Sequence, residues 1–131
     1  MSNPKGLITP QEAKALNNAY NKRCELVSKR VTKRPDNRST WFSLDEIKNY
    51  LAYAEAQTKE LGYDMDGIRI YCGAYPEQNG QAGYSTTFIV PTASGAREGK
   101  DSGKGISHDI SDADGLNNGS QGFPPNASYP Q

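Results

Sequence analysis

The chain has 131 residues, no net charge because 15 Lys and Arg balance 15 Asp and Glu, and a mean hydropathy of −0.82. A neutral chain has no global field that would attract nucleic acid or an anionic membrane, and it contains no apolar run of bilayer length. Its size suits one domain. Residues 1–6 do not look like the start of a signal peptide, so we expect a cytoplasmic protein.

The first predicted element is an amphipathic helix from about residue 9 to residue 32. Thr9 can cap it, Pro10 suits the first helical position, and Glu12 can bind back to the cap. Pro35 requires the helix to end before it. Apolar side chains recur at three- and four-residue steps, which places them on one face: Ala13, Leu16, Tyr20, Cys24, Val27 and Val31.

A second helix is predicted from about residue 43 to residue 61. Residues 43–46 form another capping box, and Phe42 and Ile47 occupy the positions of a hydrophobic staple. Gly62 is typical of the residue that follows a helix. One apolar face consists of Ile47, Leu51, Ala54, Thr58 and Leu61.

The hydrophobic period then changes from 3.6 to 2, which predicts two strands. Residues 67–75 alternate, with Ile68, Ile70 and Cys72 on one face, and residues 84–90 are mostly β-branched or aromatic. Pro91 is expected to close the second strand. We therefore expect an α+β fold in which two amphipathic helices pack on an antiparallel β-hairpin.

Composition divides the chain into three parts. Residues 1–91 predict a small α+β domain, residues 92–108 a flexible linker, and residues 109–131 a long Gly/Asn/Pro-rich tail. Phe123 and Tyr129, which are each followed by proline, could dock on the domain as part of an extended segment. A docked tail and a disordered tail are therefore both open as predictions. A hairpin has two open edges, which a tail strand, a second copy or another partner should cover.

The sequence offers little basis for catalysis, a cofactor or a metal. Cys24 and Cys72 are best explained as small buried apolar side chains, and with the lone His108 they do not make a usual zinc site. Residues 99–105 have one residue too few between their glycines for a phosphate loop. The acidic residues at 109–114 miss the positions of a calcium loop. We expect no cofactor and no metal, and the sequence favours a protein that is not an enzyme.

Five cations lie within ten residues at the predicted end of the first helix, with Trp41 close behind. Cations that contact phosphates and a ring that stacks on a base favour nucleic-acid or anion binding. Cations at a helix C-terminus also complement its dipole, so a solvated helix end is the competing explanation. The basic cluster consists of Lys29, Arg30, Lys33, Arg34 and Arg38.

The hairpin predicts a further binding surface. If Ile68 and Ile70 face the helices, then Arg69, Tyr71 and Tyr75 face outward. Tyrosine and arginine are favoured in protein-binding hot spots. Three explanations stay open for this Tyr/Arg surface: the tail covers it, a partner or second copy of the chain covers it, or it binds a ligand.

Four segments also carry a resemblance: WFSLDE at residues 41–46, GIRIYCGAYP at 67–76, TTFIVPT at 86–92 and GLNNGSQGFPP at 115–125. With them the chain resembles uncharacterised small hypothetical proteins of Bacteroidetes-type bacteria over most of its length. That group has no established activity, so the resemblance implies no catalytic residue. It does imply that the tail is more than a random linker.

Two classes of function follow. The first is a non-enzymatic interaction protein of unknown ligand, which binds a protein partner or self-associates through the hairpin. The second is a nucleic-acid or anion binder that uses the basic cluster with Trp41. No membrane partner is expected.

Overall fold

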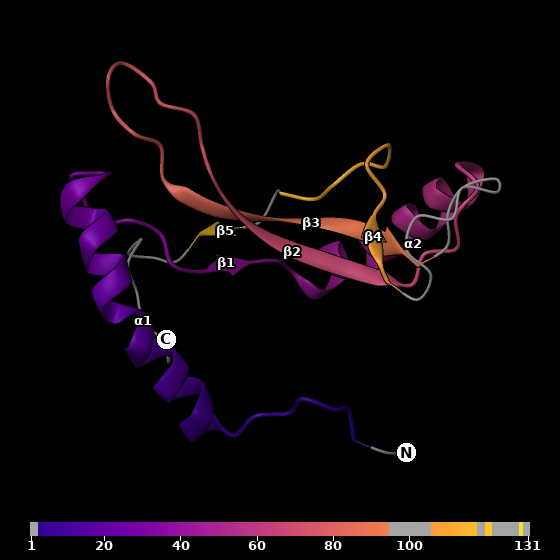
Figure 1. Ribbon diagram of the computed structural model, residues 1–131, viewed down its shortest axis with the longest axis horizontal. Coiled ribbons are helices and arrows are strands. Elements are labelled where there is room, and N and C mark those ends of the chain that lie inside the picture. Colours follow the sequence, from indigo (N-terminus) through magenta and orange to yellow (C-terminus); the bar gives the residue numbers. More distant parts are fainter. Residues whose placement is uncertain (1–2, 95–105, 118–119, 122–128, 130–131) are drawn as a thin grey trace.

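The computed structural model describes residues 3–94, 106–117, 120–121 and 129, and it has an α+β fold (Figure 1). Helices α1 (Pro10–Arg30) and α2 (Leu44–Glu60) agree with both predicted helices to within a few residues. An antiparallel sheet has the order β2-β3-β4, and β1 pairs with β5. The strands are β1 (Thr40–Trp41), β2 (Gly67–Ala74), β3 (Ser85–Ala93), β4 (His108–Asp109) and β5 (Ser120–Gln121).

Both helices begin at the caps that the sequence predicts. The Thr9 hydroxyl accepts a hydrogen bond from the Glu12 N–H at 3.1 Å, and the Glu12 carboxylate accepts one from the Thr9 N–H at 3.0 Å. The Ser43 hydroxyl accepts from the Glu46 N–H at 3.0 Å. These bonds satisfy main-chain donors that have no partner within the helix. Neither described helix is long and apolar enough to cross a membrane.

Strands β2 and β3 form the predicted hairpin, and they pair along the whole of β2. The main chains of Gln78 and Gln81 exchange hydrogen bonds of 3.0 and 2.9 Å across Asn79 and Gly80. Both central residues have positive φ, 53° and 75°. This backbone is that of the Asn-Gly turn that matches the twist of a hairpin.

Strand β3 extends three residues beyond its predicted end, because Pro91 does not close it. The N–H of Ile89 donates to the Leu116 carbonyl, away from β2. Two residues on, the nitrogen of Pro91 points the same way, so no bond to β2 is lost. The Pro91 carbonyl still accepts from the Ile110 N–H at 3.0 Å. Proline is therefore tolerated here inside a strand.

The apolar core lies where α2 meets β3. Tyr50 and Ala54 of α2 and Ile89 of β3 are buried to 7%, 0% and 3% exposure. These three side chains form one cluster, so α2 covers the β3 half of the sheet. Partly buried apolar side chains packed around it are Phe42, Ile47, Met65 and Leu116.

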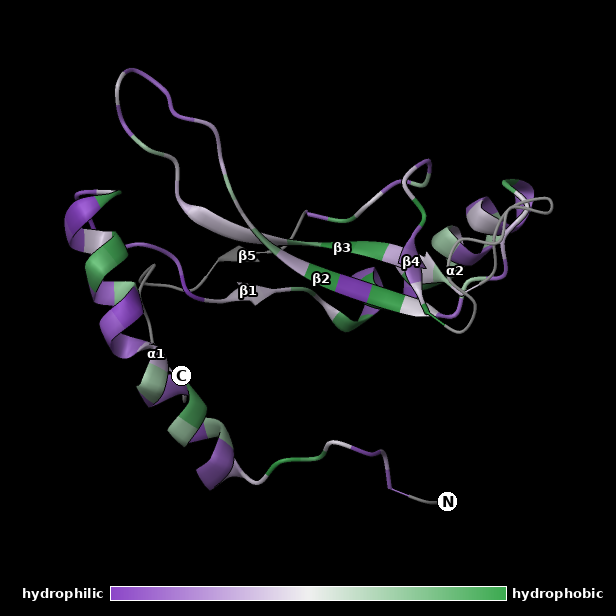
Figure 2. Ribbon diagram, in the orientation of Figure 1, coloured by the Kyte–Doolittle hydropathy of each residue, from purple (hydrophilic) through white to green (hydrophobic). Residues whose placement is uncertain are grey.

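Helix α1 differs from the expected arrangement, because it projects away from the sheet (Figure 1). Its one buried residue is Cys24, whereas Leu16 is 65% exposed and Val31, which follows the helix, is 56% exposed. Figure 2 shows the resulting apolar bands on this outlying helix. The predicted apolar stripe therefore exists, but the sheet does not cover it.

Polar contacts attach the C-terminal end of α1 to β3. The Asp36 N–H donates to the Ser28 hydroxyl at 2.9 Å. The Asp36 carboxylate accepts from the Ser85 N–H at 2.8 Å and also from the Ser85 hydroxyl. Asn37 donates to the Ser85 carbonyl at 3.1 Å. Asp36 and Asn37 are 3% and 7% exposed, so the tie is shielded from water.

Candidate functional site

The C-terminal part of the chain supplies the neighbour of β3. Residues 106–117, which we call the strap, include β4 and run along the edge of β3 that faces away from β2. Ile89 and Leu116 exchange two main-chain hydrogen bonds of 2.9 Å. One edge of the predicted hairpin is therefore closed by a strand from the same chain. Residues 95–105, which make up most of the predicted linker, lie outside the described residues.

Asp114 attaches the strap to α2. Its carboxylate accepts hydrogen bonds from the Tyr53 hydroxyl at 2.7 Å and from the Gln57 amide at 3.1 Å. The Asp114 N–H donates to Gln57 at 2.8 Å, and its carbonyl accepts from the Tyr50 hydroxyl at 2.9 Å. The contact raises the pKa of Tyr53, because its phenol donates to a carboxylate. Strap, helix and β3 therefore form one hydrogen-bonded unit.

Asp109 of the strap binds two residues of the Tyr/Arg surface. The Arg69 guanidinium donates to Asp109 at 2.5 Å and to the Ser107 carbonyl at 3.2 Å. The Tyr71 hydroxyl donates to the second carboxylate oxygen of Asp109. The bond from Tyr71, followed by that from Arg69, holds the pKa of Asp109 below its usual value.

Tyr75 also contacts the strap. Its hydroxyl donates to Asn117 at 3.2 Å, and the Asn117 amide donates to the Thr87 carbonyl at 2.7 Å. Arg69, Tyr71 and Tyr75 are thus all engaged by residues of the same chain. These contacts do not bury the surface, because Tyr71 and Tyr75 remain 37% and 43% exposed. The expected cover Phe123 lies outside the described residues, and the Tyr129 main chain pairs with the Asn17 amide of α1 instead.

Asp66 is a second carboxylate that holds the strap. It accepts hydrogen bonds from the Ser107 hydroxyl at 2.6 Å and the Thr92 hydroxyl at 2.7 Å. These donors, Ser107 first, hold the pKa of Asp66 below its usual value. The charged form is therefore the one that binds the strap.

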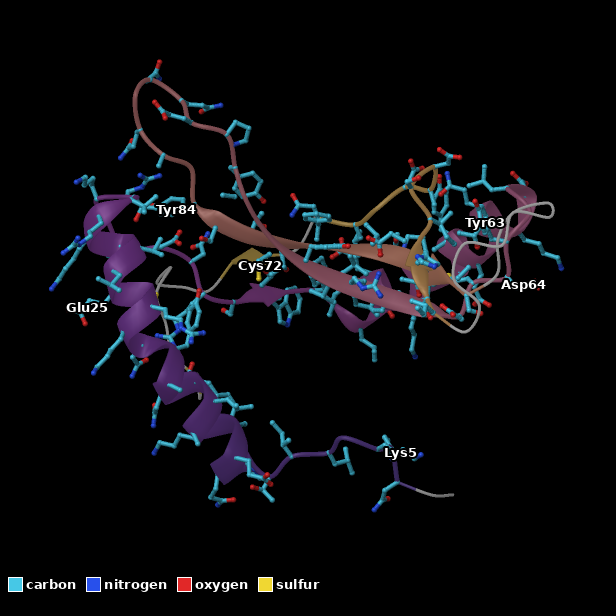
Figure 3. All side chains as sticks on the ribbon, viewed as in Figure 1. Lys5, Glu25, Tyr63, Asp64, Cys72 and Tyr84 are labelled. Carbon is cyan, nitrogen blue, oxygen red and sulfur yellow. The ribbon has the colours of Figure 1, made fainter. Side chains whose placement is uncertain are left out.

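The structure does not assemble the basic cluster into one free surface. Lys29 forms an ion pair with Glu25 at 2.8 Å. The Arg34 guanidinium lies 4.0 Å from the centre of the Tyr84 ring, and Figure 3 shows Tyr84 near the C-terminal end of α1. Arg38 donates to Asn17 and Asn21 of α1.

The remaining members of this candidate site are exposed. Arg30 and Lys33 lie at the surface, and Lys33 adopts a positive φ of 59°. Trp41 of β1 is 65% exposed. Three of the five cations therefore have partners within the chain, which favours a structural role for them.

The outer edge of β2 is open. Tyr75 donates to the Tyr84 carbonyl, so in an antiparallel ladder Gly73, Tyr71 and Arg69 also pair with β3. The main-chain groups of the intervening residues point outward: Ile68, Ile70, Cys72 and Ala74. No strand pairs with this edge within the part of the chain that the structure describes.

The side chains at this edge are apolar and exposed. Ile70 lies opposite Ile89 and therefore on the face that α2 packs against, as predicted, yet it is 63% exposed. Ile68 is 40% exposed and Cys72 is also exposed, which corrects the expectation of a buried thiol. The reason is that α2 covers β3 and stops short of β2. Figure 2 shows apolar and polar bands alternating along β2.

A pocket of about 300 Å³ lies beside the end of β2. Its lining includes Tyr20, Arg38, Cys72 and Ser85. Figure 3 labels the Cys72 side chain in the middle of the molecule. The Arg38 guanidinium already donates to Asn17 and Asn21 of α1, so a ligand in this pocket would have to compete with those hydrogen bonds. Among the described residues, no group of three or more His, Cys, Asp or Glu is placed to hold a metal ion.

Sequence reasoning did not find Asp109, Asp114 and Asn117 as contacts of the hairpin and α2. One signal was available for the first: Arg69 is the only charged residue of a strand that is otherwise apolar or uncharged, so a carboxylate partner was to be expected. For the other two no local pattern exists. Comparisons with known proteins add no assignment, since the chain matches no known protein family, no curated protein and no solved structure.

Proposed function

We propose that this chain is a non-enzymatic interaction protein that self-associates through the open edge of β2. One observation carries the proposal: an eight-residue strand has outward main-chain groups without a pairing strand among the described residues, and exposed apolar side chains beside them. Such an edge is a template for a further strand.

The absence of protective residues in β2 supports this proposal. Proteins usually guard an edge strand with lysine, proline, inward charges or a bulge. Strand β2 reads GIRIYCGA, and its one charge, Arg69, is bound to Asp109 on the face away from Ile70. By contrast, the outer edge of β3 is closed by the strap. The two edges of the hairpin are therefore treated differently.

The alternative, anion binding by the basic cluster, has less support. Lys29, Arg34 and Arg38 are each held by a contact within the chain. A phosphate would have to compete with those contacts. Arg30 and Lys33 alone make a small electrostatic footprint on a neutral chain.

Light scattering coupled to size-exclusion chromatography tests the proposal. The full chain is expected to show twice its 14.3 kDa mass at high concentration and to dissociate on dilution. Ile70→Lys should remain a monomer, because a lysine at the edge opposes strand pairing. Leu26→Lys is the matched control, since Leu26 is 54% exposed on α1, and it should leave the mass unchanged. A wild-type monomer at the highest soluble concentration would contradict the proposal.

A further inference from the structure

We infer that two copies pair their β2 strands antiparallel about a two-fold axis at Ile70, so that Ile70 of each copy lies opposite Ile70 of the other. This inference rests on the proposed self-association and specifies its register.

The free main-chain groups limit the registers. Ile68, Ile70, Cys72 and Ala74 direct their N–H and C=O groups outward, so hydrogen bonds across the axis must join members of this set. In the register centred on Ile70 they join Ile70 to Ile70 and Ile68 to Cys72. Residues opposite one another point to the same face of a sheet. Both α2 helices therefore lie on one face of the joined sheet, and the exposed apolar residues of both copies become neighbours.

The register centred on Ile70 makes complementary pairs. Ile70 meets Ile70, and Ile68 meets Cys72, so the apolar side chains pack against each other. On the other face, Arg69 lies opposite Tyr71 of the second copy, whose hydroxyl binds that copy's Asp109. Both side chains extend over β3 of their own copy to Asp109 of β4, so no unpaired charge lies at the junction between the two copies.

Neighbouring registers lack this complementarity. A centre at Arg69 would place the two Arg69 residues opposite each other, and residues of like charge in that position are unfavourable. A centre at Tyr71 would place Ile70 opposite Cys72 and Ile68 opposite Ala74, so that no isoleucine would lie opposite another isoleucine. A centre at Cys72 would place Pro76, which has no N–H, opposite Ile68.

Disulfide cross-linking reads the register directly. Opposed residues in a hydrogen-bonded antiparallel pair have Cα atoms about 5.5 Å apart, within the range of a disulfide. With oxidised glutathione as the oxidant, two thiols give one disulfide and two reduced glutathiones. Cys72→Ser combined with Ile70→Cys should form a covalent dimer, and so should Ile68→Cys with Cys72 retained. Cys24 is 5% exposed and stays out of reach.

Two proteins are matched controls. The wild type should not cross-link through Cys72, and Ile68→Cys combined with Cys72→Ser should not cross-link either, because each thiol then faces a residue without one. Efficient cross-linking of the wild type, or none with Cys72→Ser and Ile70→Cys in a dimeric sample, would overturn this register. A wild-type monomer in light scattering would instead overturn the proposed function.

Amide hydrogen exchange on the unmodified protein gives a second measurement. The amides of Ile68, Ile70 and Cys72 should exchange more slowly at concentrations where the dimer forms than in dilute solution. Exchange at these three amides that does not change while the mass doubles would place the interface elsewhere.

Discussion

Helices α1 and α2 have the same local signals and different surroundings. Each begins at a capping residue whose hydroxyl accepts a main-chain hydrogen bond, and each carries an apolar stripe. In α2 the stripe packs against β3, with Tyr50, Ala54 and Thr58 buried. In α1 only Cys24 is buried, and polar contacts of Asp36 and Arg38 hold the helix in place.

The two helices are held to the rest of the chain in two different ways. Apolar burial removes surface from water at about 25 cal/mol per Å², whereas a net hydrogen bond contributes about 0.5–1.5 kcal/mol. The α2 region should therefore carry most of the stability. The α1 region and the edge of β2 both keep apolar side chains exposed. Only the edge of β2 combines them with outward main-chain groups, which is the combination that another strand requires.

The largest expected loss of stability comes from a substitution in the core beneath α2. Ile89→Ala should lower the free energy of unfolding by about 2–5 kcal/mol, because it removes a side chain that is 3% exposed from the core cluster. Leu16→Ala, at a position 65% exposed on α1, should change it by less than about 0.5 kcal/mol. Urea denaturation measures both. Equal losses would show that α1 packs as tightly as α2.

A smaller effect is expected where α1 is attached. Asp36→Ala should lower the free energy of unfolding by about 1–3 kcal/mol, since it removes a buried carboxylate and leaves the partly buried Ser85 N–H without its acceptor. The control is Asp64→Ala, because Asp64 is exposed at the surface. If both variants unfold at the wild-type urea concentration, the contact between Asp36 and Ser85 does not stabilise the protein.

The smallest effect concerns acid and the strap. Asp66 and Asp109 have folded-state pKa values below their ordinary ones, so their contribution is complete above about pH 4 and is lost as pH falls through the folded values. Wild-type stability should therefore decrease below about pH 4. In Asp66→Asn combined with Asp109→Asn this decrease should be smaller. Urea denaturation between pH 3 and pH 7 measures it, and identical slopes would exclude these carboxylates as its cause.

Local features were the part of the fold that sequence predicted well. The caps at Thr9 and Ser43 and the change of period before Ile68 depend on neighbours within a few residues. The predicted α+β class follows from these helices and strands, and it is confirmed. The prediction that β3 ends before Pro91 was wrong. Whether a proline interrupts a strand depends on which neighbouring strand its nitrogen faces.

The candidate site was predictable only in part. The alternation of β2 correctly separated the face with Ile70 from the face with Arg69. It did not show that α2 would stop at β3 and leave Ile70 exposed. Nor could it pair Arg69 with Asp109, which is 40 residues away in the chain, since no local spacing connects them.

The sequence by itself determined where helices and strands form and which face of each is apolar, because capping and periodicity act between near neighbours. Tertiary structure alone decided which faces are covered. It set α2 on β3, the strap on the far edge of β3 and α1 away from the sheet. These choices depend on contacts between residues far apart in the chain, and they leave the outer edge of β2 without a pairing strand among the described residues.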